Sequence, residues 1–107
     1  MNNNQAAAAV KPLNIAKFLD HAGRVAQIPS KSRTRRPVLQ YLIAQFPENT
    51  EMTEREVNAL LQRISIIDFM SARRLLVDEG YLCRTPNGAS YWREKEIPMQ
   101  WRWEKNM

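Results

Sequence analysis

The sequence TEREVNALLQRISIIDFMSARRLLVDEGYLCRTPNGASYWR, residues 53–93, decides the fold because it contains a helix start, a second helix and a turn between two strands. Thr53 and Glu56 have the Thr-x-x-Glu spacing of a capping box, in which each side chain accepts a hydrogen bond from the other residue's backbone N–H. Apolar residues follow at helical spacing as far as Ile64. This pattern predicts a helix that starts at Thr53.

A second helix is predicted shortly after the first. Asp68 is a residue type that caps helix starts, and apolar side chains recur at helical spacing over Phe69–Glu79. Gly80 then supplies the left-handed backbone conformation at which many helices end. Two helices joined by a short turn are typical of a helix-turn-helix.

A β-hairpin is predicted after these two helices. Aromatic and polar residues interleave over 81–85 and 89–93, on both sides of the turn sequence Pro86-Asn87-Gly88. A hairpin in this place is the wing of a winged helix, and the second helix of a helix-turn-helix is the element that enters the DNA major groove.

Three elements are predicted before this unit. A short amphipathic helix runs from Pro12 and stops at Gly23, a brief strand over 24–28 is expected to pair with a later strand, and a further helix covers 33–46. The predicted fold class is therefore α+β, a winged helix (helix-turn-helix plus C-terminal β-hairpin) with an extra N-terminal helix and a short strand.

The length and composition predict one domain. The chain has 107 residues, of which 44% are hydrophobic, and this suffices for a single core. We expect the winged-helix-like domain to cover residues 12–97. Residues 1–11, rich in Asn and Ala, are expected to be disordered or frayed. Residues 98–107 form a C-terminal tail, in which Trp101 and Trp103 could serve an interface or fold back onto the core.

Several classes of function are disfavoured. No apolar run approaches the roughly 18–20 residues of a membrane span, and the N-terminus lacks signal-peptide features, so we expect a cytoplasmic protein without membrane contact. The only cysteine, Cys83, and the only histidine, His21, cannot form a disulfide or a usual zinc site. No nucleophile motif, carboxylate pair or Gly-rich phosphate loop is recognisable, so we expect no enzyme, no cofactor, no metal and no small-molecule substrate.

The sequence resembles one known family, the bacterial proteins of domain of unknown function 2087. The residues that carry the resemblance are Phe18-Leu19-Asp20, Gly23-Arg24, Ile28-Pro29, Lys31, Val38-Leu39, Phe46, Thr53-Glu54-Arg55-Glu56-Val57-Asn58, Leu61, Asp68, Arg73-Arg74, Leu76-Val77-Asp78, Gly80 and Tyr91-Trp92-Arg93. The resemblance implies a winged-helix-like domain in a bacterial or phage setting, since some members lie within transcription regulators, and it implies no particular activity. Ala72 and the apolar pair Ile66-Ile67 depart from the family pattern, so the same partner is not implied.

The charge of the chain suits a polyanionic partner. Sixteen Lys and Arg against eleven Asp and Glu give a formal net charge of +5. Four of the cations, Lys31, Arg33, Arg35 and Arg36, gather at the entry of the helix over 33–46, where positive charge opposes the helix dipole. Local helix energetics do not explain them, so they are predicted to bind phosphate. The alternative is ordinary solvated charge near acidic loop residues.

Further nucleic-acid contacts are predicted on the second helix of the helix-turn-helix and on the hairpin. On a helical wheel, Ser71 and Arg74 face outward from that helix. Arg84, Asn87 and Arg93 on the hairpin complete the predicted set. The competing interpretation makes this helix a scaffold, because it offers few groups that read base edges.

Arg73 is predicted to have a structural role. It falls within the apolar arc of its helix, so its aliphatic stem is expected to pack and its guanidinium to pair with Glu54 or Glu56.

The predicted function is nucleic-acid binding, with DNA as the favoured partner and transcriptional regulation as the role; RNA is a third option. The alternative is a protein–protein interaction module on the same scaffold, including a homodimer. Its apolar contact would come from Ile66, Ile67, Phe69, Met70 or the tryptophans of the tail. Fold alone does not decide between these functions.

Overall fold

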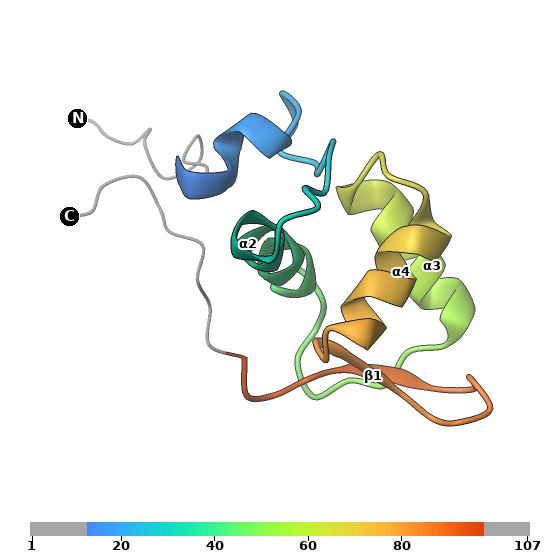
Figure 1. Ribbon diagram of the computed structural model, residues 1–107. Coiled ribbons are helices and arrows are strands. Elements are labelled where there is room, and N and C mark those ends of the chain that lie inside the picture. Colours follow the sequence, from blue (N-terminus) through green and yellow to red (C-terminus); the bar gives the residue numbers. More distant parts are fainter. Residues whose placement is uncertain (1–12, 98–107) are drawn as a thin grey trace, which may run out of the picture.

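The computed structural model describes residues 13–97, which form three α-helices, a short 3-10 helix and a two-stranded antiparallel hairpin (Figure 1). In chain order the elements are η1 Leu13–Phe18, α2 Ser32–Ile43, α3 Glu54–Ile64, α4 Phe69–Asp78, β1 Leu82–Arg84 and β2 Tyr91–Arg93. The predicted α+β class is confirmed, and the order of elements is compatible with a winged-helix layout. The predicted segments 1–11 and 98–107, with Trp101 and Trp103, lie outside the described residues.

The capping box predicted at the start of α3 is present. The Thr53 side chain accepts a hydrogen bond from the backbone N–H of Glu56 at 3.1 Å, and Glu56 Oε1 accepts one from the N–H of Thr53 at 2.8 Å. These two bonds satisfy donors that a helix start leaves free. They also fix the first turn of α3, which carries Glu54.

Replacing Thr53 by Ala is expected to lower the free energy of unfolding by about 0.5–2 kcal/mol, because the cap acceptor is lost. Urea unfolding followed by circular dichroism measures this change. The matched control is Thr50→Ala, since the Thr50 hydroxyl donates only to the Glu48 carbonyl of its own loop. Equal unfolding free energies for the two variants would show that the capping box does not stabilise α3.

The start and end of α4 also follow local signals. Asp68 Oδ2 accepts a hydrogen bond from the N–H of Ser71 at 3.3 Å, which caps the helix. Gly80 has a φ of +85°, a conformation that glycine adopts without steric cost, and the chain there turns into β1.

The hairpin pairs Leu82 with Arg93 and Arg84 with Tyr91 in antiparallel register. Tyr91 also pairs with Met52 through two backbone hydrogen bonds of 2.8 Å, so the segment before α3 continues the sheet at one position. This contact fixes the hairpin against the start of α3.

The hydrophobic core lies among the three helices, and the hairpin closes one end of it (Figure 1). Fully buried side chains come from each of these elements: Leu39, Leu61, Leu76, Leu82 and Tyr91. Burying each such side chain contributes about 1.5–3 kcal/mol, so the helices and the hairpin stabilise one another. Among the helices within residues 13–97, none is long and apolar enough to cross a bilayer.

The predicted N-terminal helix is wrong in type and length. Only Leu13–Phe18 is helical, as the 3-10 helix η1, and the chain turns at Asp20. Asp20 Oδ1 accepts hydrogen bonds from the N–H groups of Ala22 and Arg24 at 2.9 and 2.8 Å, so this side chain competes with helix continuation. The hydrogen bond from the Arg24 backbone also lowers the pKa of Asp20.

The strand predicted over 24–28 is reduced to a single residue. Val25 bridges to Leu19 and to Ser65, and its N–H and C=O bond to Ile64 and Ile66 at 3.0 and 2.9 Å. The segment therefore pairs with the end of α3 rather than with a later strand of the hairpin.

The predicted end of α2 at Phe46 is also corrected. The helix ends at Ile43, and the N–H groups of Gln45 and Phe46 bond to carbonyls three residues earlier, at 3.1 and 3.0 Å. Such bonds tighten the last turn of a helix.

Candidate nucleic-acid interface

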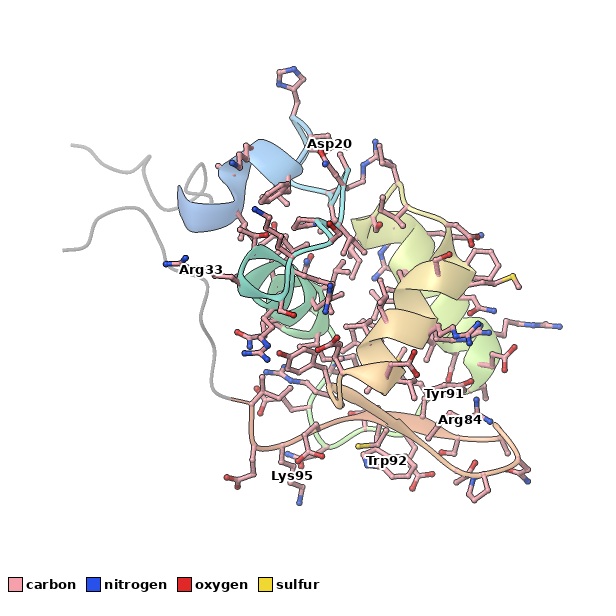
Figure 2. The ribbon with its side chains drawn as sticks, in the orientation of Figure 1. Asp20, Arg33, Arg84, Tyr91, Trp92 and Lys95 are labelled. Carbon is pink, nitrogen blue, oxygen red and sulfur yellow. The ribbon has the colours of Figure 1, made fainter. Side chains whose placement is uncertain are left out.

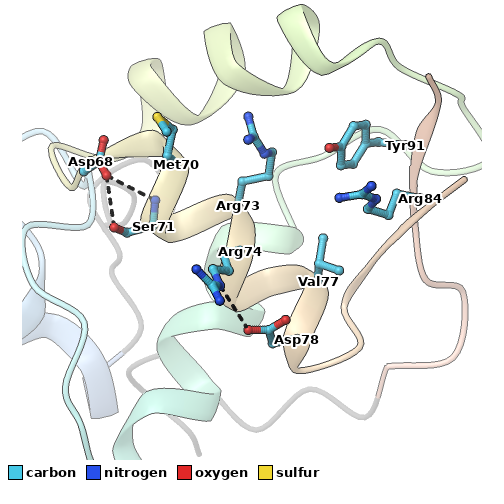
Figure 3. A pocket seen from close by; sticks show the side chains of 9 residues that line it. All are labelled: Asp68, Met70, Ser71, Arg73, Arg74, Val77, Asp78, Arg84 and Tyr91. Carbon is cyan, nitrogen blue, oxygen red and sulfur yellow. Dashed lines mark hydrogen bonds and ion pairs between the residues drawn. The ribbon is translucent and has the colours of Figure 1, made fainter. Parts of the chain in front are cut away.

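A hollow of about 500 Å³ lies between the outer side of α4 and the hairpin (Figure 3). We call it the α4–hairpin groove. Its lining residues are Asp68, Met70, Ser71, Arg73, Arg74, Val77, Asp78, Arg84 and Tyr91. Three predicted site residues, Ser71, Arg74 and Arg84, therefore meet here, although they come from two separate elements.

Arg84 reaches the groove from the end of β1. Its guanidinium donates to the backbone carbonyls of Thr85 and Pro86, both at 3.2 Å, and lies 5.9 Å from the centre of the Tyr91 ring. Figure 3 shows Arg84 and Tyr91 pointing from the hairpin toward α4. Within residues 13–97, Arg84 makes no ion pair with a carboxylate, so its positive charge is available to an external anion.

Arg73 is held by α3, as the sequence predicts. Its side chain is 18% exposed, its Nη1 lies 3.6 Å from Glu54 Oε2, and the same nitrogen donates to Asn58 Oδ1. Of the two predicted partners, the structure shows Glu54. Glu56 is not a partner because its carboxylate is used in the capping box with Thr53.

Arg74 and Ser71 lie on the outer side of α4. The Arg74 side chain is 84% exposed, and its Nε lies 3.9 Å from the exposed carboxylate of Asp78. The Ser71 hydroxyl donates to Asp68 at 3.0 Å. Arg74 is thus held only by a solvent-exposed i,i+4 pair, a type that is worth little.

Glu54 and Tyr91 organise the wall of the groove, a role that the sequence does not reveal for Tyr91. The Tyr91 hydroxyl donates to Glu54 Oε1 at 3.3 Å, and the other oxygen of the same carboxylate faces Arg73. The Tyr91 ring is only 1% exposed. One carboxylate therefore connects α3, α4 and the hairpin. The sequence indicated Glu54 only as one of two possible partners of Arg73.

Asn87 shapes the tip of the hairpin. Its Oδ1 accepts hydrogen bonds from the Thr85 hydroxyl at 2.8 Å and from the N–H of Ala89 at 3.0 Å. Gly88 follows with a φ of +72°, and a Cβ there would lie 3.5 Å from Arg84 Nη2. The tip is therefore folded close against Arg84.

The cations predicted at the entry of α2 divide into two sets. Arg35 turns toward α4, where its Nη2 lies 3.1 Å from Glu79 Oε2, and it also donates to the Ser30 carbonyl. Lys31, Arg33 and Arg36 are exposed and make no ion pair within residues 13–97. We call these three the α2 cations.

The α2 cations do not belong to the groove. Figure 2 shows Arg33 and Arg84 at opposite sides of the molecule, with the helices between them. The structure therefore presents the predicted cations on two surfaces rather than one.

Arg93 is directed away from the groove as well. Its Nη1 donates to the Phe46 carbonyl at 3.2 Å and lies 3.6 Å from Glu48 Oε2, and the side chain is largely buried. This arginine ties the hairpin to the loop that follows α2. Nearby, the Cys83 thiol donates to Glu94 at 3.3 Å, and partial burial together with this carboxylate raises the pKa of Cys83, so the thiol stays protonated at neutral pH.

Three α-helices followed by an antiparallel hairpin, with arginines lining the hollow beside the last helix, define a small α+β domain of winged-helix-compatible layout. The chain belongs to the family described as "Uncharacterized protein conserved in bacteria (DUF2087)", whose model matches residues 24–93. This confirms the family inferred from the sequence, and the match includes every residue that lines the groove. No curated protein and no solved structure matches the chain.

Proposed function

We propose that the chain binds double-stranded DNA through the α4–hairpin groove. The observation that carries this proposal is that Arg73, Arg74 and Arg84 line one hollow between a helix and a hairpin. Guanidinium groups suit phosphate because their planar set of donors matches its oxygens. In the layout of a winged helix, α4 would lie along the major groove while the hairpin contacts the adjacent backbone.

Two of these arginines can exchange their present partners for phosphate at a small cost in free energy. Arg74 would give up a long, exposed pair with Asp78. Arg84 would give up bonds to neutral carbonyls, which are weaker than bonds to an anion. Arg73 contributes its charge but stays on Glu54 and Asn58, where it positions α4 against α3.

The acidic residues of the groove restrict where a DNA backbone can pass. Asp68 and Asp78 lie at the two ends of α4 and repel phosphate. The phosphates are therefore expected near Arg84 and the middle of α4. Ser71 and Arg74 are the outward groups of α4 that could contact base edges. A role as a small bacterial transcription regulator would follow from such binding.

The direct test is to titrate a fluorescent duplex of arbitrary sequence with the chain and to measure the fluorescence anisotropy of the duplex. Saturable binding is expected, with a Kd of about 10⁻⁴–10⁻⁶ M at physiological salt if the contacts are mainly to phosphates. An unchanged anisotropy at millimolar protein would reject the proposal. A single strand of the same sequence and an RNA duplex identify the preferred nucleic acid.

Glu54→Gln is expected to raise the affinity for a duplex about two- to fivefold. The substitution removes one negative charge beside Arg73 while an oxygen remains to accept from the Tyr91 hydroxyl. The Coulomb interaction between a phosphate and a unit charge a few ångström away, in a watery environment, accounts for a change in affinity of this size. The anisotropy titration measures it, and Glu51→Gln, on the loop before α3, is the charge-matched control. Weaker binding by Glu54→Gln would contradict the proposed position of the phosphates.

Protein binding is the second candidate function, favoured by two exposed apolar side chains. Ile66 and Met70 are each 56% exposed, on the turn before α4 and on its first turn. Met70 lines the groove as well. An association that is insensitive to salt and that Met70→Gln weakens would support this function rather than DNA binding.

A further inference from the structure

The α2 cations form a second surface that the groove does not use. Lys31, Arg33 and Arg36 are exposed, and no acidic residue occurs between positions 21 and 47 of the sequence. Arg33 and Arg36 are three positions apart on α2, so they lie on one face of the helix. Among the described residues, no carboxylate forms an ion pair with this patch of positive charge.

Arg35 shows that a cation of α2 can pair with a carboxylate of the protein. The α2 cations have no such partner among the described residues. Its guanidinium crosses to α4 and pairs with Glu79, so that its charge has a carboxylate partner inside the fold. The neighbouring Arg33 and Arg36 face solvent instead, at the positive end of the helix dipole, where cations gain no local stability. An external anion would remove this unfavourable interaction.

The two cationic surfaces point in opposite directions. In Figure 2, Arg33 lies at one side of the molecule and Arg84 at the other. A straight duplex bound in the α4–hairpin groove therefore lies on the side of the molecule opposite to Arg33. The same duplex could reach the α2 cations only by bending around the domain, which costs elastic energy.

We propose that the chain bridges two DNA segments, holding one in the α4–hairpin groove and a second against the α2 cations. This inference rests on the proposed function, because it takes the groove as the first duplex site. The second site contacts phosphates only, since a few flexible cations at the start of a helix offer no means to read bases. The bridge is formed by a single copy of the chain.

Co-capture of two duplexes tests the bridge with the full chain. One short duplex is fixed to beads through biotin, a second carries a fluorophore, and the fluorescence retained at low salt is measured against protein concentration. For a bivalent monomer, retention rises and then falls, because excess protein fills each duplex separately. Arg33→Gln/Arg36→Gln is expected to lower the maximum about tenfold or more, while anisotropy shows that it still binds one duplex.

Arg24→Gln/Arg63→Gln is the matched control, because it removes the same formal charge away from both surfaces. Arg24 pairs with Asp20, which Figure 2 places apart from Arg33 and Arg84, and Arg63 lies in the last turn of α3. This control is expected to retain co-capture.

The outcomes separate the two proposals. Binding of a single duplex without co-capture would overturn the bridge and leave the groove site standing. Co-capture that survives Arg33→Gln/Arg36→Gln would also overturn it, since two grooves of a dimer would then hold the duplexes. Loss of all duplex binding in Arg33→Gln/Arg36→Gln would instead contradict the groove as a DNA site.

Discussion

Replacing Tyr91 by Ala is expected to lower the free energy of unfolding by about 3–5 kcal/mol, the range seen when a buried aromatic side chain is truncated. The Tyr91 ring is 1% exposed, and its backbone pairs with both Arg84 and Met52. Its loss leaves a cavity beneath the hairpin and removes the surface under Arg84. Urea unfolding measures the effect.

Tyr91→Phe is the matched control for this prediction. It keeps the ring and removes only the hydrogen bond to Glu54, so the expected cost is about 0.5–1.5 kcal/mol. If Tyr91→Ala were as mild as Tyr91→Phe, the ring would not hold the hairpin against the core. If Tyr91→Phe were as destabilising as Tyr91→Ala, the hydrogen bond to Glu54 would be the dominant interaction.

The local signals in residues 53–93 were sufficient to predict the second half of the fold. The Thr53 capping box, the Asp68 cap and the turn at Gly88 each act within a few residues, and each is present in the structure. The N-terminal part was less predictable. Asp20 ends the first helix early with a side-chain turn, and Val25 pairs with the end of α3, a contact that spans forty residues of sequence.

The candidate site was predictable residue by residue but not as an arrangement. The sequence identified Arg74 and Arg84, yet only the folded hairpin brings them to one hollow. Arg35 was grouped with its neighbours in sequence, whereas its partner Glu79 lies 44 residues away. Side-chain pairing over such separations depends on how α2 and α4 pack, and periodicity does not determine that packing.

The second large effect is expected from Arg74→Gln/Arg84→Gln, which should weaken duplex binding in the groove by about a hundredfold or more. Hydrogen bonds to charged groups contribute about 1.5–3 kcal/mol each, and two such contacts are lost. The measurement is made in the Arg33→Gln/Arg36→Gln background, so that only the groove is observed. Stability should change by less than about 1.5 kcal/mol, because the Asp78 pair is exposed and the contact of Arg84 with Tyr91 is weak.

Arg24→Gln/Arg63→Gln in the same background controls for total charge. It removes two cations outside the groove, so the affinity should fall far less than with Arg74→Gln/Arg84→Gln. Equal losses in both variants would mean that DNA responds to net charge alone and that the groove is not a defined site.

The most direct measurement is the affinity of the Arg33→Gln/Arg36→Gln chain for one duplex at about 50 and about 200 mM salt. Arg74 and Arg84, the two groove arginines that can each neutralise a phosphate, predict that the affinity falls about twelvefold over this range. An affinity that does not change with salt, or the absence of binding at the lower salt, would contradict DNA binding in the α4–hairpin groove.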